Sequence, residues 1–160
     1  MERRKYRIFL DSNVILSGLF SSGGPPRLIL DILSLGLPVL SGLTGRFNLT
    51  EVERNLEKKL PAALPTFRDE LPLLNLEIVP VPQAEDIMSF IGAVDAKDAP
   101  VLASAIQGRA DHFMTGDKKL LARIHRMGGL GFRSTNPADL MEKVLADILV
   151  GGKTRSQEGR

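Results

Sequence analysis

The sequence predicts an α/β fold with a mostly parallel central sheet and helices on both faces. Short apolar segments of strand length alternate with longer segments whose apolar residues recur every three or four positions. Such alternation favours parallel strands joined by helical crossovers. The chain has 160 residues, of which 43% are hydrophobic, enough for one domain with a buried core. We expect that domain over residues 1–150 and a polar, disordered tail over 151–160.

In the first half of the chain, glycine and proline mark where helices begin and end. Pro25 and Pro26 begin a helix, because proline is tolerated in a first turn, and Gly36 ends it. Apolar residues at helical spacing continue between these limits. The expected elements are a strand at 6–10, helices at 14–20 and 27–35, a strand at 38–41 and a helix at 46–60.

In the second half, proline interrupts residues 61–75, where a short helix is expected over 67–73. Pro80 and Pro82 close the next strand, and Pro137 begins the last helix. The remaining expected elements are strands at 76–81, 111–115 and 131–134 and helices at 84–93, 97–109, 117–126 and 137–150.

Composition excludes several classes of site. The chain has no cysteine, which rules out disulfides, zinc–thiolate sites and cysteine nucleophiles and fits a reducing cytoplasm. No apolar run is long enough to cross a bilayer, and the apolar stretch near the N-terminus is too short for a signal peptide. The net charge is +2; residues 1–7 contribute +3 and residues 151–160 contribute +2, which leaves −3 for the body. A body-wide cationic surface for nucleic acid is therefore not predicted.

Four acidic residues carry the chemical signal. Asp11, Asp98 and Asp117 stand at helix starts, two of them directly after strand-like sequence, and Glu51 lies in the 46–60 helix. Each has a simpler explanation alone, because aspartate caps helices and helical glutamate is commonly solvated. Together, at the carboxyl edge of a parallel sheet, they would repel one another unless a cation neutralised them. Mg²⁺ or Mn²⁺ is the cation that such oxygen ligands suit, and metal-assisted attack on a phosphodiester is the chemistry it supports.

The motifs around these acids resemble those of the PIN-domain family of metal-dependent ribonucleases. The resembling segments are Asp-Ser-Asn at 11–13, Glu-Val-Glu-Arg-Asn-Leu at 51–56, the alanine-rich run from Asp98 to 105, Thr-Gly-Asp at 115–117 and Asn-Pro-Ala-Asp-Leu at 136–140. The resemblance covers about residues 6–146 and selects Glu51 over Glu53. It implies a PIN-like fold and a divalent-metal-dependent endoribonuclease, similar to the toxin component of a prokaryotic toxin–antitoxin pair.

The resemblance also assigns roles to residues. It implies that Asp11, Glu51, Asp98 and Asp117 are catalytic and hold Mg²⁺ or Mn²⁺. Polar groups at Ser12, Asn13 and Thr115 would orient the carboxylates and bound waters. The cations Lys119, Arg123 and Arg126, spaced along one helix, could hold an RNA backbone, although a solvated helix face explains them as well.

Two other functions are compatible with part of the pattern. A PIN-like module could grip RNA or protein without cutting, but the presence of all four acids argues against it. A phosphatase of the haloacid-dehalogenase type needs an aspartate two positions after Asp11, where Asn13 stands.

The expected partners are an RNA substrate, a protein antitoxin and a second copy of the chain, in the cytoplasm and without a membrane. The homodimer follows from the resemblance and from apolar residues that one domain does not obviously need. Those residues are Leu16, Leu19, Phe20, Leu35 and Leu37. Exposed together, they would form an interface patch; otherwise they belong to the core.

Overall fold

A computed structural model describes residues 4–150 and contains a five-stranded parallel sheet. The strands are β1 (Tyr6–Leu10), β2 (Leu40–Gly45), β3 (Glu77–Val79), β4 (His112–Met114) and β5 (Arg133–Thr135). Their order is β3-β2-β1-β4-β5, so the first strand of the chain is the middle strand of the sheet. The α/β fold with a parallel sheet is therefore confirmed.

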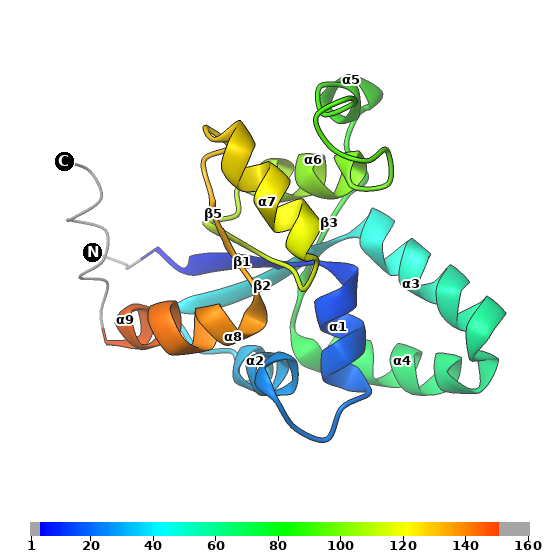
Figure 1. The fold of residues 1–160 in the computed structure, drawn as a ribbon. Coiled ribbons are helices and arrows are strands. Elements are labelled where there is room, and N and C mark those ends of the chain that lie inside the picture. The colour runs from blue at the N-terminus through cyan, green and yellow to red at the C-terminus, as the bar shows by residue number, and fades with distance from the viewer. Residues whose placement is uncertain (1–3, 151–160) are drawn as a thin grey trace.

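Helices cover both faces of the sheet (Figure 1). They are α1 (Ser12–Leu19), α2 (Pro25–Ser34), α3 (Arg46–Lys59), α4 (Leu64–Glu70), α5 (Ala84–Met88), α6 (Ala99–Gln107), α7 (Lys118–Met127), α8 (Pro137–Asp139) and α9 (Leu145–Leu149). In Figure 1, α1, α2, α8 and α9 lie on one side of the sheet and α6 and α7 on the other. Short 3₁₀ turns flank α4, and a π-helical turn at 140–144 joins α8 to α9.

Alternation along β1 divides the core between the two faces. Ile8 and Leu10 pack in a cluster with residues of α1, α2 and the C-terminal helices. Phe9 points the opposite way and packs with residues of α6 and α7. All three side chains are buried. A strand that is buried on both faces needs consecutive apolar residues, and Ile8, Phe9 and Leu10 provide them.

Several predicted elements have different limits in the structure, and two differ most. The second strand runs over Leu40–Gly45 instead of 38–41. Gly42 lies within it, where an added Cβ would stand 2.7 Å from Leu76 and 2.9 Å from Leu33, so close packing requires glycine. The helix expected at 84–93 ends at Met88, and the chain then turns through Gly92, whose φ of 90° an L-residue rarely adopts.

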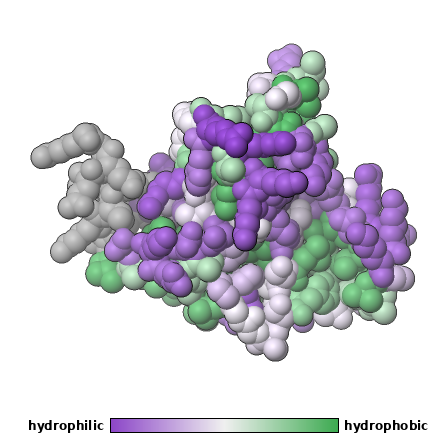
Figure 2. Space-filling model, viewed as in Figure 1, coloured by the Kyte–Doolittle hydropathy of each residue, from purple (hydrophilic) through white to green (hydrophobic). Residues whose placement is uncertain are grey.

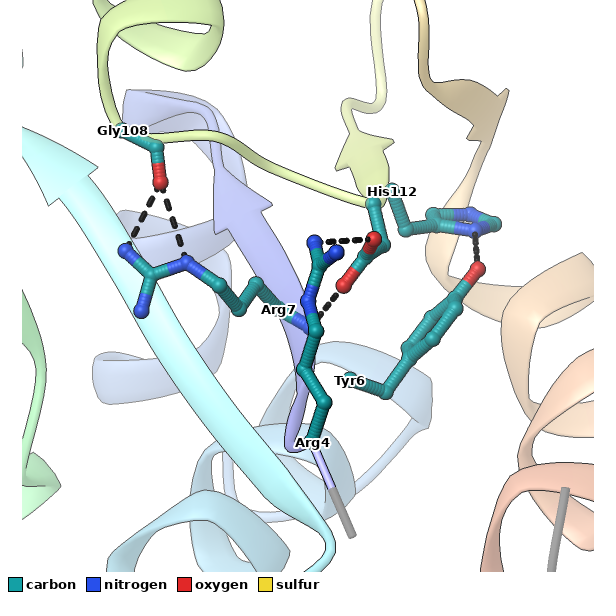
Figure 3. Close-up of polar contacts among 6 residues, drawn as sticks. Arg4, Tyr6, Arg7, Gly108 and His112 are labelled. Carbon is teal, nitrogen blue, oxygen red and sulfur yellow. Dashed lines mark hydrogen bonds and ion pairs between the residues drawn. The ribbon is translucent and has the colours of Figure 1, made fainter.

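The amino-terminal edge of the sheet is tied together by polar contacts (Figure 3). The imidazole of buried His112 hydrogen-bonds to the Tyr6 hydroxyl (3.0 Å) and to the Thr135 hydroxyl (2.7 Å). Arg7 donates to the carbonyl of Gly108 through two nitrogens, at 2.7 and 3.0 Å. These contacts join β1, β4 and β5 at the edge opposite to the helix starts where the four acids were predicted.

The five apolar residues considered for a dimer surface are not exposed together. Leu19 is buried, and Leu16 and Leu37 pack against the core. Phe20 (44% exposed) and Leu35 (69% exposed) reach the surface. Leu16, Leu19 and Leu37 therefore belong to the core, and only Phe20 and Leu35 remain available to a partner.

The outer surface is mixed. Hydrophilic residues lie over α7 and the outer end of α3, and hydrophobic residues over α5 (Figure 2). Within residues 4–150, no helix combines the length and the apolar character needed to cross a membrane.

Candidate metal centre

Asp11 lies directly after β1 and is the N-cap of α1. Its carboxylate is only 8% exposed and is surrounded by donors. The backbone N–H of Ser12 donates to Oδ1 (2.8 Å), and the Asn48 amide donates to the same oxygen (3.2 Å). The Thr115 hydroxyl donates to Oδ2 (2.8 Å), and the Asn13 amide reaches it at 3.4 Å. The carboxylate is therefore fixed in position by groups from α1, α3 and the segment after β4.

Thr115 connects Asp11 to the Asp117 segment. Besides donating to Asp11, its hydroxyl oxygen accepts from the Asn13 amide (3.2 Å) and from the Asp117 backbone N–H (3.1 Å). One hydroxyl donates once and accepts twice here, which uses its full hydrogen-bonding capacity. Asn13 adds a second connection, since its Oδ1 accepts from the Gly116 N–H (2.9 Å). The polar residues predicted to support the acids thus bridge the ends of β1 and β4.

Asn48 is a site residue that the sequence reasoning missed. It is fully buried in the first turn of α3, and its amide donates to Asp11 Oδ1 and to Ser12 Oγ (3.0 Å). These two bonds fix the orientation of the amide, because a flipped one would place its oxygen against the carboxylate. The signal was its spacing: Asn48 stands three residues before Glu51 and four before Val52, on one side of the helix.

The charges of the four predicted acids contribute to raised pKa values at Asp11, Glu51 and Asp98. Burial raises the pKa of Asp11, and the charges of Asp117 and Glu51 raise it further, against hydrogen bonds from Thr115 and Ser12 that lower it. Burial also raises the pKa of Asp98, with Asp11 and Asp117 adding to the effect and Lys97 opposing it. For Glu51, burial and then the charge of Asp98 raise the pKa. The structure therefore brings the four acids to one edge of the sheet.

Each acid is placed differently. Asp117 is the N-cap of α7, and its Oδ1 accepts from the N–H groups of Lys119 (3.0 Å) and Leu120 (3.1 Å). Asp98 occupies the N-cap position of α6, but its side chain makes no capping hydrogen bond. The helix-cap explanation therefore accounts for Asp117 and not for the side chain of Asp98. Glu51 is partly buried in α3, where a purely solvated glutamate would be exposed.

The donor set suits a hard divalent cation. Its ligands would be carboxylate oxygens, which Mg²⁺ and Mn²⁺ prefer. The raised pKa values of Asp11, Asp98 and Glu51 reflect burial and mutual repulsion, and a bound cation relieves the repulsion. Within residues 4–150, no three Asp, Glu or His side chains are clustered tightly enough to form a ready-made cage. Mg²⁺ keeps several waters and needs only one or two direct carboxylates, so a loose set is compatible with it.

The three cations considered for RNA binding lie on α7 but are not equivalent. Lys119 and Arg126 are exposed, and neither forms an ion pair within residues 4–150. Arg123 is committed to a contact, because its Nη1 lies 2.7 Å from Asp95 Oδ1. Asp95, then Asp98 and Asp117, raise the pKa of Arg123, which shows that its charge lies on the side of the acids.

An open pocket of about 410 Å³ adjoins the acids. Its lining includes Asn13, Asp117, the start of α2 at Pro25 and the start of α8 at Pro137, so Asp117 is the one predicted acid that borders it. Its lining is mostly apolar apart from Asn13, Asp117, Asn136 and Ser17. A flexible polymer that contacted the acids would have room to continue into this pocket.

Comparisons with known proteins agree with this architecture. A family model described as PIN domain matches residues 7–119, which include all four acids. A solved structure of VapBC2 from Rickettsia felis, bound to a DNA fragment from their promoter, is similar in fold, with a TM-score of 0.59. The two chains are 16% identical, and the match covers 81% of this chain and 98% of that one. No curated protein matches the sequence.

Proposed function

Because the chain belongs to the PIN domain family, we propose that it is a divalent-metal-dependent endoribonuclease that hydrolyses RNA phosphodiester bonds. The observation that supports the proposal is the electrostatic influence of Asp11, Glu51, Asp98 and Asp117 on one another, three of which stand at helix starts. Such a group of carboxylates weakens the fold unless it binds a cation, so its presence favours a function that uses one.

The proposed roles follow from how each side chain is held. Asp11 is the fixed ligand, because four donors from three segments orient its oxygens. Asp98 and Asp117 would complete the binding of Mg²⁺ or Mn²⁺, and Glu51 would be a further ligand or would orient water. The bound ion lowers the pKa of a water molecule and stabilises charge on a phosphate. Ser12, Asn13, Asn48 and Thr115 keep Asp11 in place and touch no reacting atom themselves.

RNA would reach the acids across α7 and the open pocket. Lys119 and Arg126 are exposed cations on α7, available to phosphates. The body of the protein carries net negative charge, so these cations and the bound ion must supply the attraction for a polyanion.

We further propose that the chain is the toxin of a toxin–antitoxin pair in the cytoplasm and that it forms a homodimer. The toxin role is supported by the motif resemblance, and the four acids would suit an antitoxin arginine that pairs with their carboxylates. Exposed apolar side chains at Phe20, Leu28 (48%) and Leu35 offer a surface for a protein partner. Light scattering at micromolar concentration tests the dimer, and growth on expression tests the toxin.

A cleavage assay on purified protein tests the nuclease. Single-stranded and hairpin RNA are incubated with Mg²⁺, Mn²⁺ or excess chelator, using wild type, Asp11→Asn and Asp69→Asn. Asp69 is an exposed aspartate on α4, far along the chain from the four acids, and serves as the matched control. We expect Asp11→Asn to lose more than about 100-fold in rate, beyond the 10–100-fold typical of residues one step removed from a metal.

Two results would reject the nuclease. One is full activity of Asp11→Asn, and the other is undiminished cleavage in excess chelator. A protein that binds RNA and Mn²⁺ but never cuts would favour the non-cleaving module instead.

A further inference from the structure

We propose that Asp95 and Arg123 form a brace that fixes the Asp98 segment against α7 and thereby sets how tightly the acids hold a divalent ion. The inference rests on the proposed function for its consequence, although the brace itself is a feature of the fold. Arg123 Nη1 and Asp95 Oδ1 are 2.7 Å apart, and the two residues belong to different elements. Asp95 lies in the turn before α6, and Arg123 lies in α7.

On one side, Asp95 determines how α6 begins. Its backbone carbonyl accepts from the N–H groups of Asp98 (2.8 Å) and Ala99 (3.2 Å). The Asp95 carbonyl thus satisfies the N–H of the N-cap residue and of the first helical residue, while the side chain of Asp98 makes no capping hydrogen bond. The Asp98 carboxylate is thereby left unused by the helix and available to a cation. The direction in which the Asp98 carboxylate points therefore depends on the position of Asp95.

On the other side, Arg123 is rigidly related to Asp117. Asp117 caps the same helix, and Leu120 and Ile124 anchor that helix in the core with exposed fractions of 1% and 4%. The guanidinium thus extends from a fixed helix toward the turn at 91–98. Within residues 4–150, side chains of that turn make no other hydrogen bond or ion pair with another element, although Val94 is buried in the core.

The brace is not expected to stabilise the fold much. Both side chains are substantially exposed, at 38% for Arg123 and 58% for Asp95, and exposed ion pairs contribute little to folding. Its expected effect is local: it keeps the two segments that carry Asp98 and Asp117 at one separation. Arg123 and Asp95 are therefore positioning residues, because neither would touch the ion or the substrate.

Two simpler roles for these residues predict different results for the same substitutions. If only long-range charge mattered, removing the cation at Arg123 would tighten Mn²⁺ binding and removing the anion at Asp95 would weaken it. Each such effect would be about fourfold for a unit charge about 10 Å from a divalent ion in water without added salt. If Arg123 instead contacted RNA phosphate, its loss would raise KM and lower the salt dependence of binding by about one unit of slope, without involving Asp95. The brace predicts that both single changes weaken Mn²⁺ binding.

The test is a double-mutant cycle on the full-length protein with Asp95→Asn, Arg123→Gln and both together. Calorimetry measures Mn²⁺ binding, and hydrogen exchange measures protection of the 95–99 amides without metal. We expect each single variant to weaken Mn²⁺ binding about tenfold, the lower end for residues that orient metal ligands, and the double variant to be no worse. Both singles should also lose protection at the Asp98 and Ala99 amides. A charge-swapped pair, Asp95→Arg with Arg123→Asp, should recover part of both losses.

Arg126→Gln and Asp86→Asn are the matched controls, because each removes an exposed charge of the same sign without an ion pair in residues 4–150. Unchanged or tighter Mn²⁺ binding in Arg123→Gln would overturn the inference, as would losses that multiply in the double variant. If wild-type protein binds Mn²⁺ but does not cut RNA, the proposed nuclease function is refuted. The double-mutant cycle would still test the brace, because it measures Mn²⁺ binding and not cleavage. Wild-type protein that binds no Mn²⁺ would refute the metal consequence, and unchanged exchange at 95–99 would refute the brace itself.

Discussion

Replacing Thr115 with valine should cost far more stability than the same change at a neighbouring buried threonine. Valine keeps the shape of the side chain and removes only its hydroxyl. At Thr115 that hydroxyl donates to the Asp11 carboxylate and accepts from Asn13 and from the Asp117 N–H. The residue is fully buried, so water cannot replace the lost bonds.

The magnitude can be built from these three contacts. A hydrogen bond to a charged group contributes roughly 1.5–3 kcal/mol and a neutral one roughly 0.5–1.5 kcal/mol. The added methyl group recovers about 0.8 kcal/mol through burial. Thr115→Val should therefore lower the free energy of unfolding by roughly 2–5 kcal/mol. For a chain of this size, each kcal/mol lowers Tm by about 2–4 °C.

Thr44→Val is the matched control. Thr44 is also fully buried, on β2 at the other side of β1, and its hydroxyl makes one neutral bond, to the carbonyl of Leu10 (2.9 Å). Its replacement should cost less than about 1 kcal/mol by the same arithmetic. Urea unfolding of wild type and both variants measures the difference at neutral pH.

The effect of Thr115 should also depend on pH. The hydroxyl lowers the pKa of Asp11, so it favours the ionised carboxylate of the folded state. Its contribution is present above the pKa of Asp11 and shrinks as pH falls through it. Equal losses in Thr115→Val and Thr44→Val, or a Thr115 loss independent of pH, would show that the hydroxyl does not hold an ionised Asp11.

Three further predictions concern charge in the folded state. Because burial and neighbouring acids raise the pKa of Asp98, its ionised form costs stability, and Asp98→Asn should stabilise the metal-free protein by up to about 1 kcal/mol at neutral pH. That gain should vanish as pH falls below the usual carboxyl range, and a Tm below wild type at neutral pH would contradict it. Mn²⁺ at about 100 times its Kd should raise the free energy of unfolding by about 2.7 kcal/mol in wild type and much less in Asp11→Asn, measured by thermal melting with and without chelator. Burial lowers the pKa of His112 from 6.5 to about 4, so the unfolded chain takes up the proton first and stability is lost as pH falls through that window. The loss should reach roughly 3 kcal/mol and should be absent in His112→Gln; identical urea midpoints against pH for the two proteins would disprove it.

The parts of the fold that the sequence predicted are those with a strong local cause. β1 ends in three consecutive apolar residues directly before Asp11, and α2 begins with two prolines, so both were located to within one or two residues. The extension of β2 to Gly45 was missed, because Gly42 and Gly45 carry no strand preference of their own. Their place in the sheet comes from close packing against Leu33, Leu76 and Ser104, which only the folded chain brings near.

The same difference between local patterns and contacts of distant segments applies to the residues of the site. Asp11 and Asp117 were recognisable because an acid at the junction of strand and helix is a local pattern, and Glu51 was identified through the resemblance alone. Asn48 was missed because a buried asparagine looks like any polar residue of a first helical turn until its partner, 37 positions away, is known. The ion pair between Arg123 and Asp95 was not predicted either. Helical spacing shows which residues share one face of a helix, but it does not show which residues of other segments contact that face.

The central place of β1 has a consequence for synthesis of the chain. Among the strands of this sheet β1 is synthesised first, and its second neighbour, β4, follows only after about a hundred further residues. Thr115, which holds Asp11, comes from the end of that same strand. A nascent chain that stops short of residue 115 therefore carries Asp11 without its hydroxyl partner. The fold can therefore hold Asp11 through Thr115 only when translation of the domain is well advanced.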